Sequence, residues 1–113
     1  MLNKDFWKDK KVFISGNTGF KGSWLSIWLS SLGSKVYGYS LEPEIPKCLF
    51  EIANLENIIE TQISDIRDYK ALSQSINNFN PDIVFHLAAQ PLVRRSYKFP
   101  IETYETNVIG TAN

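Results

Sequence analysis

Four short apolar segments alternate along the chain with longer stretches in which apolar residues recur every three or four positions. The apolar segments are bounded by glycine, proline and polar residues, which is typical of buried strands. They predict strands at residues 11–15, 35–39, 58–63 and 83–87. The stretches between them predict helices at residues 19–32, 48–55 and 69–78, and a loop through Pro91 leads to a last helix from about Pro100. This alternation indicates an α/β protein with a parallel sheet covered on both faces.

Right-handed crossovers between such strands produce a Rossmann-type doubly wound sheet. Residues 1–113 are expected to supply its first four strands and the flanking helices. The chain stops at Asn113 inside a predicted helix, without a glycine, a proline or a cap. We therefore expect these residues to be the front part of a longer protein, with the rest of the domain absent.

Three local patterns refine this expectation. Phe20, Trp24 and Trp28 recur at helical spacing, which predicts that their rings face the core. Asp68 directly precedes the third predicted helix, where its side chain is placed to cap the N-terminus. Segment 42–46 contains two prolines, so it is predicted to be neither helix nor central strand.

A glycine-rich segment separates the first predicted strand from the first predicted helix. It reads Gly16-Asn17-Thr18-Gly19-Phe20-Lys21-Gly22, a GxxGxxG spacing. In this arrangement the first glycine permits a tight turn, the second lets the backbone approach phosphate groups, and the third lets the helix pack closely on the strand. The helix N-terminus then directs unpaired N–H groups at an anion. The segment predicts a site for a dinucleotide pyrophosphate, with a simple packing turn as the alternative.

Composition mainly excludes other kinds of protein. The chain has 12 basic and 12 acidic side chains, so no net charge favours nucleic acid or an anionic membrane. No apolar run approaches the roughly 20 residues that span a bilayer, and the N-terminus lacks the apolar core of a signal peptide. Cys48 is the one cysteine, which excludes an internal disulfide and, with one histidine, a Cys/His metal site. We expect a cytoplasmic protein with no bound metal, no nucleic-acid partner and no membrane partner.

His86 is the one histidine and lies on the fourth predicted strand, between Phe85 and Leu87. A histidine in such an apolar setting is more often a hydrogen-bonded core residue than a chemical participant. We expect a core role for it.

Four segments together resemble the extended short-chain dehydrogenase/reductase family, and within it the nucleotide-sugar dehydratases. They are the glycine-rich segment, Asp65-Ile66-Arg67-Asp68, His86-Leu87-Ala88-Ala89-Gln90 and Thr106-Asn107-Val108-Ile109-Gly110-Thr111. Residues 18–25 and 88–94 are similar to the branch of the family that dehydrates CDP-glucose. The resemblance identifies residues 1–113 as the N-terminal part of an NAD(P)-binding Rossmann domain, without the remainder of that domain and without the substrate domain.

The resemblance also implies which residues meet the cofactor. Asp65 and the backbone of Ile66 would hold the adenine, the small Ala88 and Ala89 would leave room for the nicotinamide ribose, and Thr106 would approach the cofactor. A solvated loop acid is the alternative for Asp65, and an ordinary polar helix residue is the alternative for Thr106. The implied cofactor-binding residues are Gly16, Thr18, Gly19, Phe20, Lys21, Gly22, Ser40, Asp65, Ile66, Leu87, Ala88, Ala89 and Thr106.

For the substrate, the resemblance implies a nucleotide-sugar. Gln90 would bind sugar hydroxyls, which suit an amide donor and acceptor. Either Arg94 or Arg95 would reach the pyrophosphate or a second subunit, and Arg94 is the predicted contact. Asn107 would secure the loop around the site. The full-length protein is expected to be a homodimer.

The choice between NAD and NADP depends on the end of the second strand. Many NAD-binding folds place an acid there for the ribose 2′-OH. This chain has Tyr39-Ser40, with Glu42 further on, and Lys21 adds a cation near the phosphates. The resemblance implies NAD and leaves NADP as the alternative.

The implied activity of the longer protein is a lyase reaction, the 4,6-dehydration of CDP-glucose to CDP-4-keto-6-deoxyglucose. Hydride leaves C4, water is lost across C5 and C6, and hydride returns at C6. The family's Tyr-x-x-x-Lys pair is absent, because no tyrosine of the chain is followed four places later by lysine. The catalytic residues are expected beyond Asn113, and residues 1–113 alone are expected to be inactive. The alternatives are another nucleotide-sugar epimerase or reductase, and a non-catalytic NAD(P)-binding regulatory module.

Overall fold

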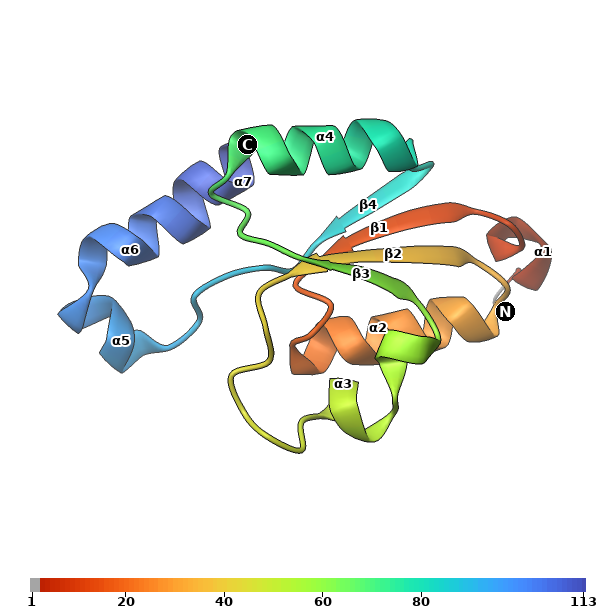
Figure 1. Ribbon diagram of the computed structural model, residues 1–113, viewed down its shortest axis with the longest axis horizontal. Coiled ribbons are helices and arrows are strands. Elements are labelled where there is room, and N and C mark those ends of the chain that lie inside the picture. The colour runs from red at the N-terminus through yellow and green to blue at the C-terminus, as the bar shows by residue number, and fades with distance from the viewer. Residues whose placement is uncertain (1–2) are drawn as a thin grey trace.

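The computed structural model describes residues 3–113, which form a four-stranded parallel sheet in the order β3-β2-β1-β4 (Figure 1). The central strands β1 and β2 pair over five residues each. The strands are β1 (Lys11–Ser15), β2 (Lys35–Ser40), β3 (Glu60–Ile63) and β4 (Ile83–His86). All pairs are parallel and helices cover both faces, so the predicted Rossmann-type doubly wound sheet is confirmed.

The helices lie in two layers and one outer group. In Figure 1, α2 and α3 lie on one face of the sheet and α4 on the other, while α5 and α6 lie beyond the ends toward which the strands point. The helices are α1 (Lys4–Trp7), α2 (Phe20–Ser31), α3 (Leu49–Ile52), α4 (Tyr69–Phe79), α5 (Val93–Lys98), α6 (Pro100–Tyr104) and α7 (Gly110–Ala112). A 3-10 turn occupies Leu55–Asn57, and a π-helical turn, Glu105–Ile109, joins α6 to α7. No helix in residues 3–113 is long and apolar enough to cross a membrane.

The core has two parts because successive side chains of β1 point to opposite faces. Val12 and Ile14 pack with Leu29 on the α2 side. Phe13, between them, packs with Leu72 on the α4 side. Both faces of the sheet are therefore apolar, as the continuous apolar segments predicted.

The predicted orientation of the α2 aromatics is wrong. Phe20, Trp24 and Trp28 are 71%, 53% and 52% exposed, whereas the buried face of α2 carries small residues and Leu29. The reason is the close approach of the helix to the loop that follows β1. A Cβ atom on Gly22 would collide with the carbonyl of Gly16, so only small side chains fit against the sheet at this end.

Two other local predictions differ from the structure. The predicted helix at residues 48–55 is only α3, because Asn54 adopts a left-handed conformation (φ 52°) and ends it. The predicted loop after Pro91 contains α5, whose start has no side-chain cap and so no local sequence signal. The predicted cap is confirmed, since Asp68 Oδ1 accepts from the Ala71 N–H at 3.0 Å.

Candidate functional site

A cavity of about 820 Å³ opens at the carboxyl ends of the strands, the edge at which doubly wound sheets bind ligands. Its wall comes from the segments that follow β1, β2, β3 and β4, together with the π-helical turn. The residues predicted to bind a cofactor or substrate here are, with the exception of Arg94, all in this wall: Gly16, Thr18, Gly19, Phe20, Lys21, Gly22, Ser40, Asp65, Ile66, Leu87, Ala88, Ala89, Gln90 and Thr106.

The glycine-rich segment has the geometry that its spacing predicted. Gly16 has φ +79°, and a Cβ atom there would lie 2.7 Å from the backbone nitrogen of Ala88. Gly19 is the N-cap of α2 and makes no side-chain cap hydrogen bond, so the first amides of α2 open into the cavity uncapped. Gly22 lets α2 approach the Gly16 carbonyl. The segment can therefore present backbone N–H groups to an anion.

Asn17 lies inside this segment and was missed by sequence reasoning. Its side chain is completely buried, and Nδ2 donates to Thr61 Oγ1 on β3 at 2.9 Å. The amide passes over Gly38 of β2, where a Cβ atom would collide with it. A glycine inside a predicted strand was the available signal, because such a glycine often marks a close approach.

The end of β2 joins the glycine-rich segment through hydroxyl groups. Thr18 Oγ1 donates to the Leu41 carbonyl at 2.9 Å and lies 2.7 Å from Ser40 Oγ, which therefore donates to it. Glu42 and Glu44 also line the cavity at this side. The corner next to β2 thus holds neutral hydroxyls and two carboxylates.

Asp65 is held by Arg67 at the end of β3. Its Oδ1 accepts from the backbone N–H of Arg67 at 2.9 Å, and its Oδ2 lies 2.6 Å from a terminal nitrogen of the same guanidinium. The side-chain hydrogen bonds of Arg67 lower the pKa of Asp65 despite its partial burial. The carboxylate is therefore anionic and oriented at neutral pH.

Gln90 lines the cavity, but its side chain is bonded within its own loop. Oε1 accepts from the Leu92 N–H at 2.7 Å, and Nε2 donates to Thr103 Oγ1 at 3.0 Å. Asn107 holds the backbone of Gln90, as the resemblance implied that it would secure this loop.

The structure brings Arg95 to the cavity and leaves Arg94 outside it. Arg95 lies on α5, where it forms ion pairs with Glu102 at 2.8 Å and with Glu44 at 3.7 Å. Its Nε atom is buried and has no hydrogen-bond partner within residues 3–113. Sequence reasoning considered both arginines, but without the α5 helix it had no periodicity with which to choose between them.

The expectation of a core position for His86 is wrong, because the residue is exposed at the edge strand β4. The expectation that the ring is hydrogen-bonded is confirmed. Nδ1 lies 2.6 Å from Ser15 Oγ, and Nε2 lies 2.9 Å from Thr111 Oγ1. The ring is not part of the cavity wall.

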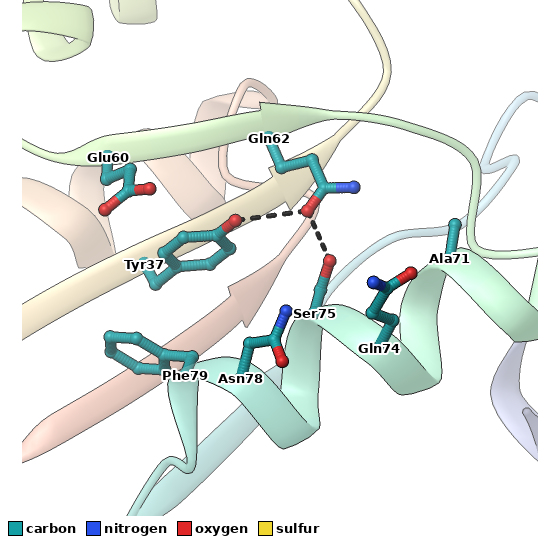
Figure 2. A pocket seen from close by; sticks show the side chains of 8 residues that line it. All are labelled: Tyr37, Glu60, Gln62, Ala71, Gln74, Ser75, Asn78 and Phe79. Atoms are coloured by element: carbon teal, nitrogen blue, oxygen red, sulfur yellow. Dashed lines mark hydrogen bonds between the residues drawn. The ribbon is translucent and has the colours of Figure 1, made fainter.

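A second hollow, of about 500 Å³, lies between α4 and the strands β2 and β3 (Figure 2). Tyr37 OH donates to Gln62 Oε1 at 3.1 Å, and Ser75 Oγ donates to the same oxygen. Burial raises the pKa of Tyr37. The lining carries amides and Glu60 but no cation, and the N–H of Ala71 in the first turn of α4 is already bonded to Asp68, so the hollow lacks the groups that would bind a phosphate.

A parallel doubly wound sheet, a GxxGxxG turn and a cavity at the strand ends define the nucleotide-binding Rossmann class of the short-chain dehydrogenases/reductases. The chain belongs to the GDP-mannose 4,6 dehydratase family, whose model matches residues 13–113.

Individual relatives agree with this family. The chain is 56% identical to the CDP-glucose 4,6-dehydratase of Salmonella typhimurium over 113 residues, which are all of this chain and 32% of that protein. It is 33% identical to a GDP-mannose 4,6-dehydratase of Sordaria araneosa, over 98% of this chain and 20% of that protein. The crystal structure of UDP-glucose 4-epimerase from Brucella ovis in complex with NAD superposes with a TM-score of 0.77 at 25% identity, covering 91% of this chain and 30% of that one. The chain thus spans a third or less of the length of these relatives.

Proposed function

We propose that the chain is the cofactor-binding portion of an NAD-dependent nucleotide-sugar 4,6-dehydratase that converts CDP-glucose to CDP-4-keto-6-deoxyglucose. The observation that carries the proposal is the cavity itself, because it collects every residue predicted to meet the cofactor. The choice of CDP-glucose is supported by the 56% identity to an enzyme of that name.

The residues of the cavity fit a dinucleotide. The pyrophosphate would lie against the uncapped N-terminus of α2 and the backbone of Gly16 and Gly19. Asp65 and the backbone of Ile66 would hold the adenine. The segment from Leu87 to Ala89 has small side chains at its end and would leave room for the nicotinamide ribose.

When bound, the dinucleotide would supply reversible hydride transfer with the sugar. The contribution of this chain would be to hold the reactants close together and to exclude water. In the proposal Arg95 replaces Arg94 as the contact to the sugar-nucleotide pyrophosphate, since Arg95 lines the cavity and Arg94 does not. Gln90 would present its amide to the sugar after exchanging one of its loop hydrogen bonds.

The proton-transfer groups of the proposed enzyme would come from outside residues 1–113, where a tyrosine and a lysine four residues apart are expected. The proposal includes a homodimer and a cytoplasmic location, both supported by the family resemblance alone. Reading the coding DNA downstream of the Asn113 codon tests this part. An open frame with Tyr-x-x-x-Lys supports the dehydratase, and its product would then be assayed with CDP-glucose and, as control, GDP-mannose.

NAD is proposed over NADP because of the charges near β2. Glu42 and Glu44 would repel a 2′-phosphate, and the Arg67 guanidinium is occupied by Asp65. Lys21 opposes this preference, since it is a cation in the same wall. Calorimetric titration of the chain with NAD⁺ and NADP⁺ is the test, and we expect NAD⁺ to bind at least about tenfold more tightly. Equal or tighter binding of NADP⁺ would contradict the assignment.

A nucleotide-sugar epimerase is the second candidate, supported by the Brucella ovis epimerase as a structural neighbour. The two candidates differ in product. A dehydratase turns CDP-glucose into a 4-keto-6-deoxy sugar, whereas an epimerase returns a sugar of unchanged mass. Mass spectrometry of the nucleotide-sugar after incubation with the full gene product separates them, because dehydration removes one water. A non-catalytic module would bind the dinucleotide and leave the nucleotide-sugar unchanged.

A further inference from the structure

His86, the last residue of β4, lies between the end of β1 and the last helical segment. Its ring nitrogens contact Ser15 Oγ at 2.6 Å and Thr111 Oγ1 at 2.9 Å. Ser15 is the last residue of β1 and stands in register with His86. Because the imidazole is not part of the cavity wall, any effect that it has on a bound ligand is indirect.

The contacts of Thr111 determine where the ring carries its proton. Thr111 Oγ1 donates its single hydrogen to the Asn107 carbonyl at 2.7 Å, so it accepts from the imidazole. His86 Nε2 is therefore the protonated nitrogen, and the bare Nδ1 accepts from Ser15 Oγ. This neutral tautomer gives every hydrogen of the network one acceptor. A doubly protonated ring would leave the Ser15 hydroxyl hydrogen without an acceptor.

The Ser15 hydroxyl in turn contacts the backbone of Leu87 and Ala88, which form the part of the cavity wall that we call the floor. Its Oγ accepts from the backbone N–H of Ala88 at 3.3 Å and, at 3.1 Å, from that of Leu87, which also donates to the Ser15 carbonyl at 3.0 Å. The Ala88 backbone in turn touches the glycine-rich segment at Gly16, where an added Cβ would lie 2.7 Å away. A serine hydroxyl that points its hydrogen at His86 Nδ1 leaves its lone pairs for these two amides.

The second ring nitrogen, Nε2, contacts Thr111, which is bonded to the π-helical turn of the cavity wall. Nε2 donates to the Thr111 hydroxyl, and that hydroxyl donates to the carbonyl of Asn107 in the π-helical turn. Asn107 binds the backbone of Gln90 at 2.7 and 3.1 Å, and Thr106 of the same turn lines the cavity. Single π-helical turns occur frequently at functional sites. One imidazole therefore connects the floor of the cavity to the wall that carries Gln90 and Thr106.

We propose that His86 is a positioning residue, whose neutral Nε2–H tautomer sets the relative placement of two walls of the dinucleotide cavity without touching the ligand. The effect on ligand affinity rests on the proposed function. The tautomer of His86 and the backbone contacts of Ser15 do not depend on the proposed function, because both are measured in the chain without a ligand.

The first test is nuclear magnetic resonance on the ¹⁵N-labelled chain without a histidine tag. Because the chain contains one histidine, a long-range ¹⁵N–¹H spectrum reports its tautomer directly. We expect the Nε2–H pattern, together with an Ala88 amide that exchanges slowly with solvent. The Nδ1–H pattern, or an average of both tautomers, would overturn the proposal.

The second test compares three variants that keep different contacts. His86→Asn retains an acceptor for Ser15, His86→Gln retains a donor for Thr111, and His86→Phe retains neither. We expect faster amide exchange at Ala88 in the Gln and Phe variants but not in the Asn variant, with Leu87, which also donates to the Ser15 carbonyl, as the internal reference. Unchanged exchange in His86→Phe would overturn the proposal, because packing alone would then hold the floor.

Calorimetry with NAD⁺ adds the functional readout. Each lost hydrogen bond is expected to weaken the Kd about two- to tenfold, as for a typical neutral pair. Thr111→Val should weaken binding in the wild-type background but add nothing in the His86→Phe background. Additive effects would contradict a connection through the ring. A wild-type chain that fails to bind NAD⁺ would contradict the proposed function, while the exchange measurement would still decide the role of His86.

Discussion

Asn107 binds both backbone groups of Gln90: Oδ1 accepts from the Gln90 N–H at 2.7 Å, and Nδ2 donates to the Gln90 carbonyl at 3.1 Å. The two residues lie 17 positions apart, on the π-helical turn and on the loop that follows β4. This pair fixes the backbone of the loop that carries Gln90 in the cavity wall.

Replacing the amide of Asn107 should loosen this loop. Asn107→Asp keeps an acceptor but places an oxygen against the Gln90 carbonyl, and Asn107→Ala leaves both backbone groups without their partner. We expect either change to lower the free energy of unfolding by about 1–2 kcal/mol in urea titrations. Asn77→Ala on the exposed side of α4 is the control, with an expected change below about 0.5 kcal/mol. Equal effects at both positions would contradict the importance of the Asn107 pair.

Two glycines with positive φ provide a matched test of the glycine-rich segment. Gly16 and Gly33 have φ +79° and +86°, but only Gly16 faces backbone atoms that a Cβ would meet below 3 Å. Gly33→Ala should cost about 1–2 kcal/mol, the ordinary penalty of a left-handed conformation. Gly16→Ala should cost more and should abolish NAD⁺ binding. The measurements are urea unfolding and calorimetry, and similar costs for both variants would argue against a tight contact between Gly16 and Ala88.

The ion pair between Asp65 and Arg67 should make stability depend on pH. Arg67 lowers the pKa of folded Asp65, so the pair stabilises the fold above the ordinary pKa of an aspartate, near 3.9, and this contribution is lost as the pH falls through the folded value. The difference in unfolding free energy between wild type and Arg67→Gln should therefore be larger at pH 7 than at pH 3. Arg94→Gln removes an exposed arginine outside the cavity as the control, and its effect should be the same at both pH values.

The exposed aromatic face of α2 predicts an unusual contrast between adjacent residues. Trp28 is half exposed and Leu29 is buried, although tryptophan is the larger side chain. We expect Leu29→Ala to cost about 2–5 kcal/mol, because it leaves a cavity under the helix. Trp28→Gln should cost less than about 1 kcal/mol. Urea unfolding of both variants decides the point, and a larger cost for Trp28 would restore the core orientation that helical spacing predicted.

Much of the architecture could be read from local patterns. β-branched and aromatic runs predicted the strands, and the glycine spacing predicted the tight turn at Gly16, which has a positive φ in the structure. The cap at Asp68 was predictable because it satisfies N–H groups within its own helix. Helix α5 was not, since it starts without a side-chain cap, and its Arg95 forms ion pairs with residues elsewhere in the chain.

The sequence by itself determined the strand-helix alternation, and hence a parallel sheet with its ligand cavity at the carboxyl ends. These features follow from burial periods and turn conformations that a few neighbouring residues encode. Only the tertiary structure decided which face of α2 packs inward, because the larger apolar side chains lie on the exposed face and the choice depends on the close approach of the helix to the loop at Gly22 and Gly16. Only the tertiary structure, likewise, placed His86 between Ser15 and Thr111, since hydrogen bonds between distant segments have no local period.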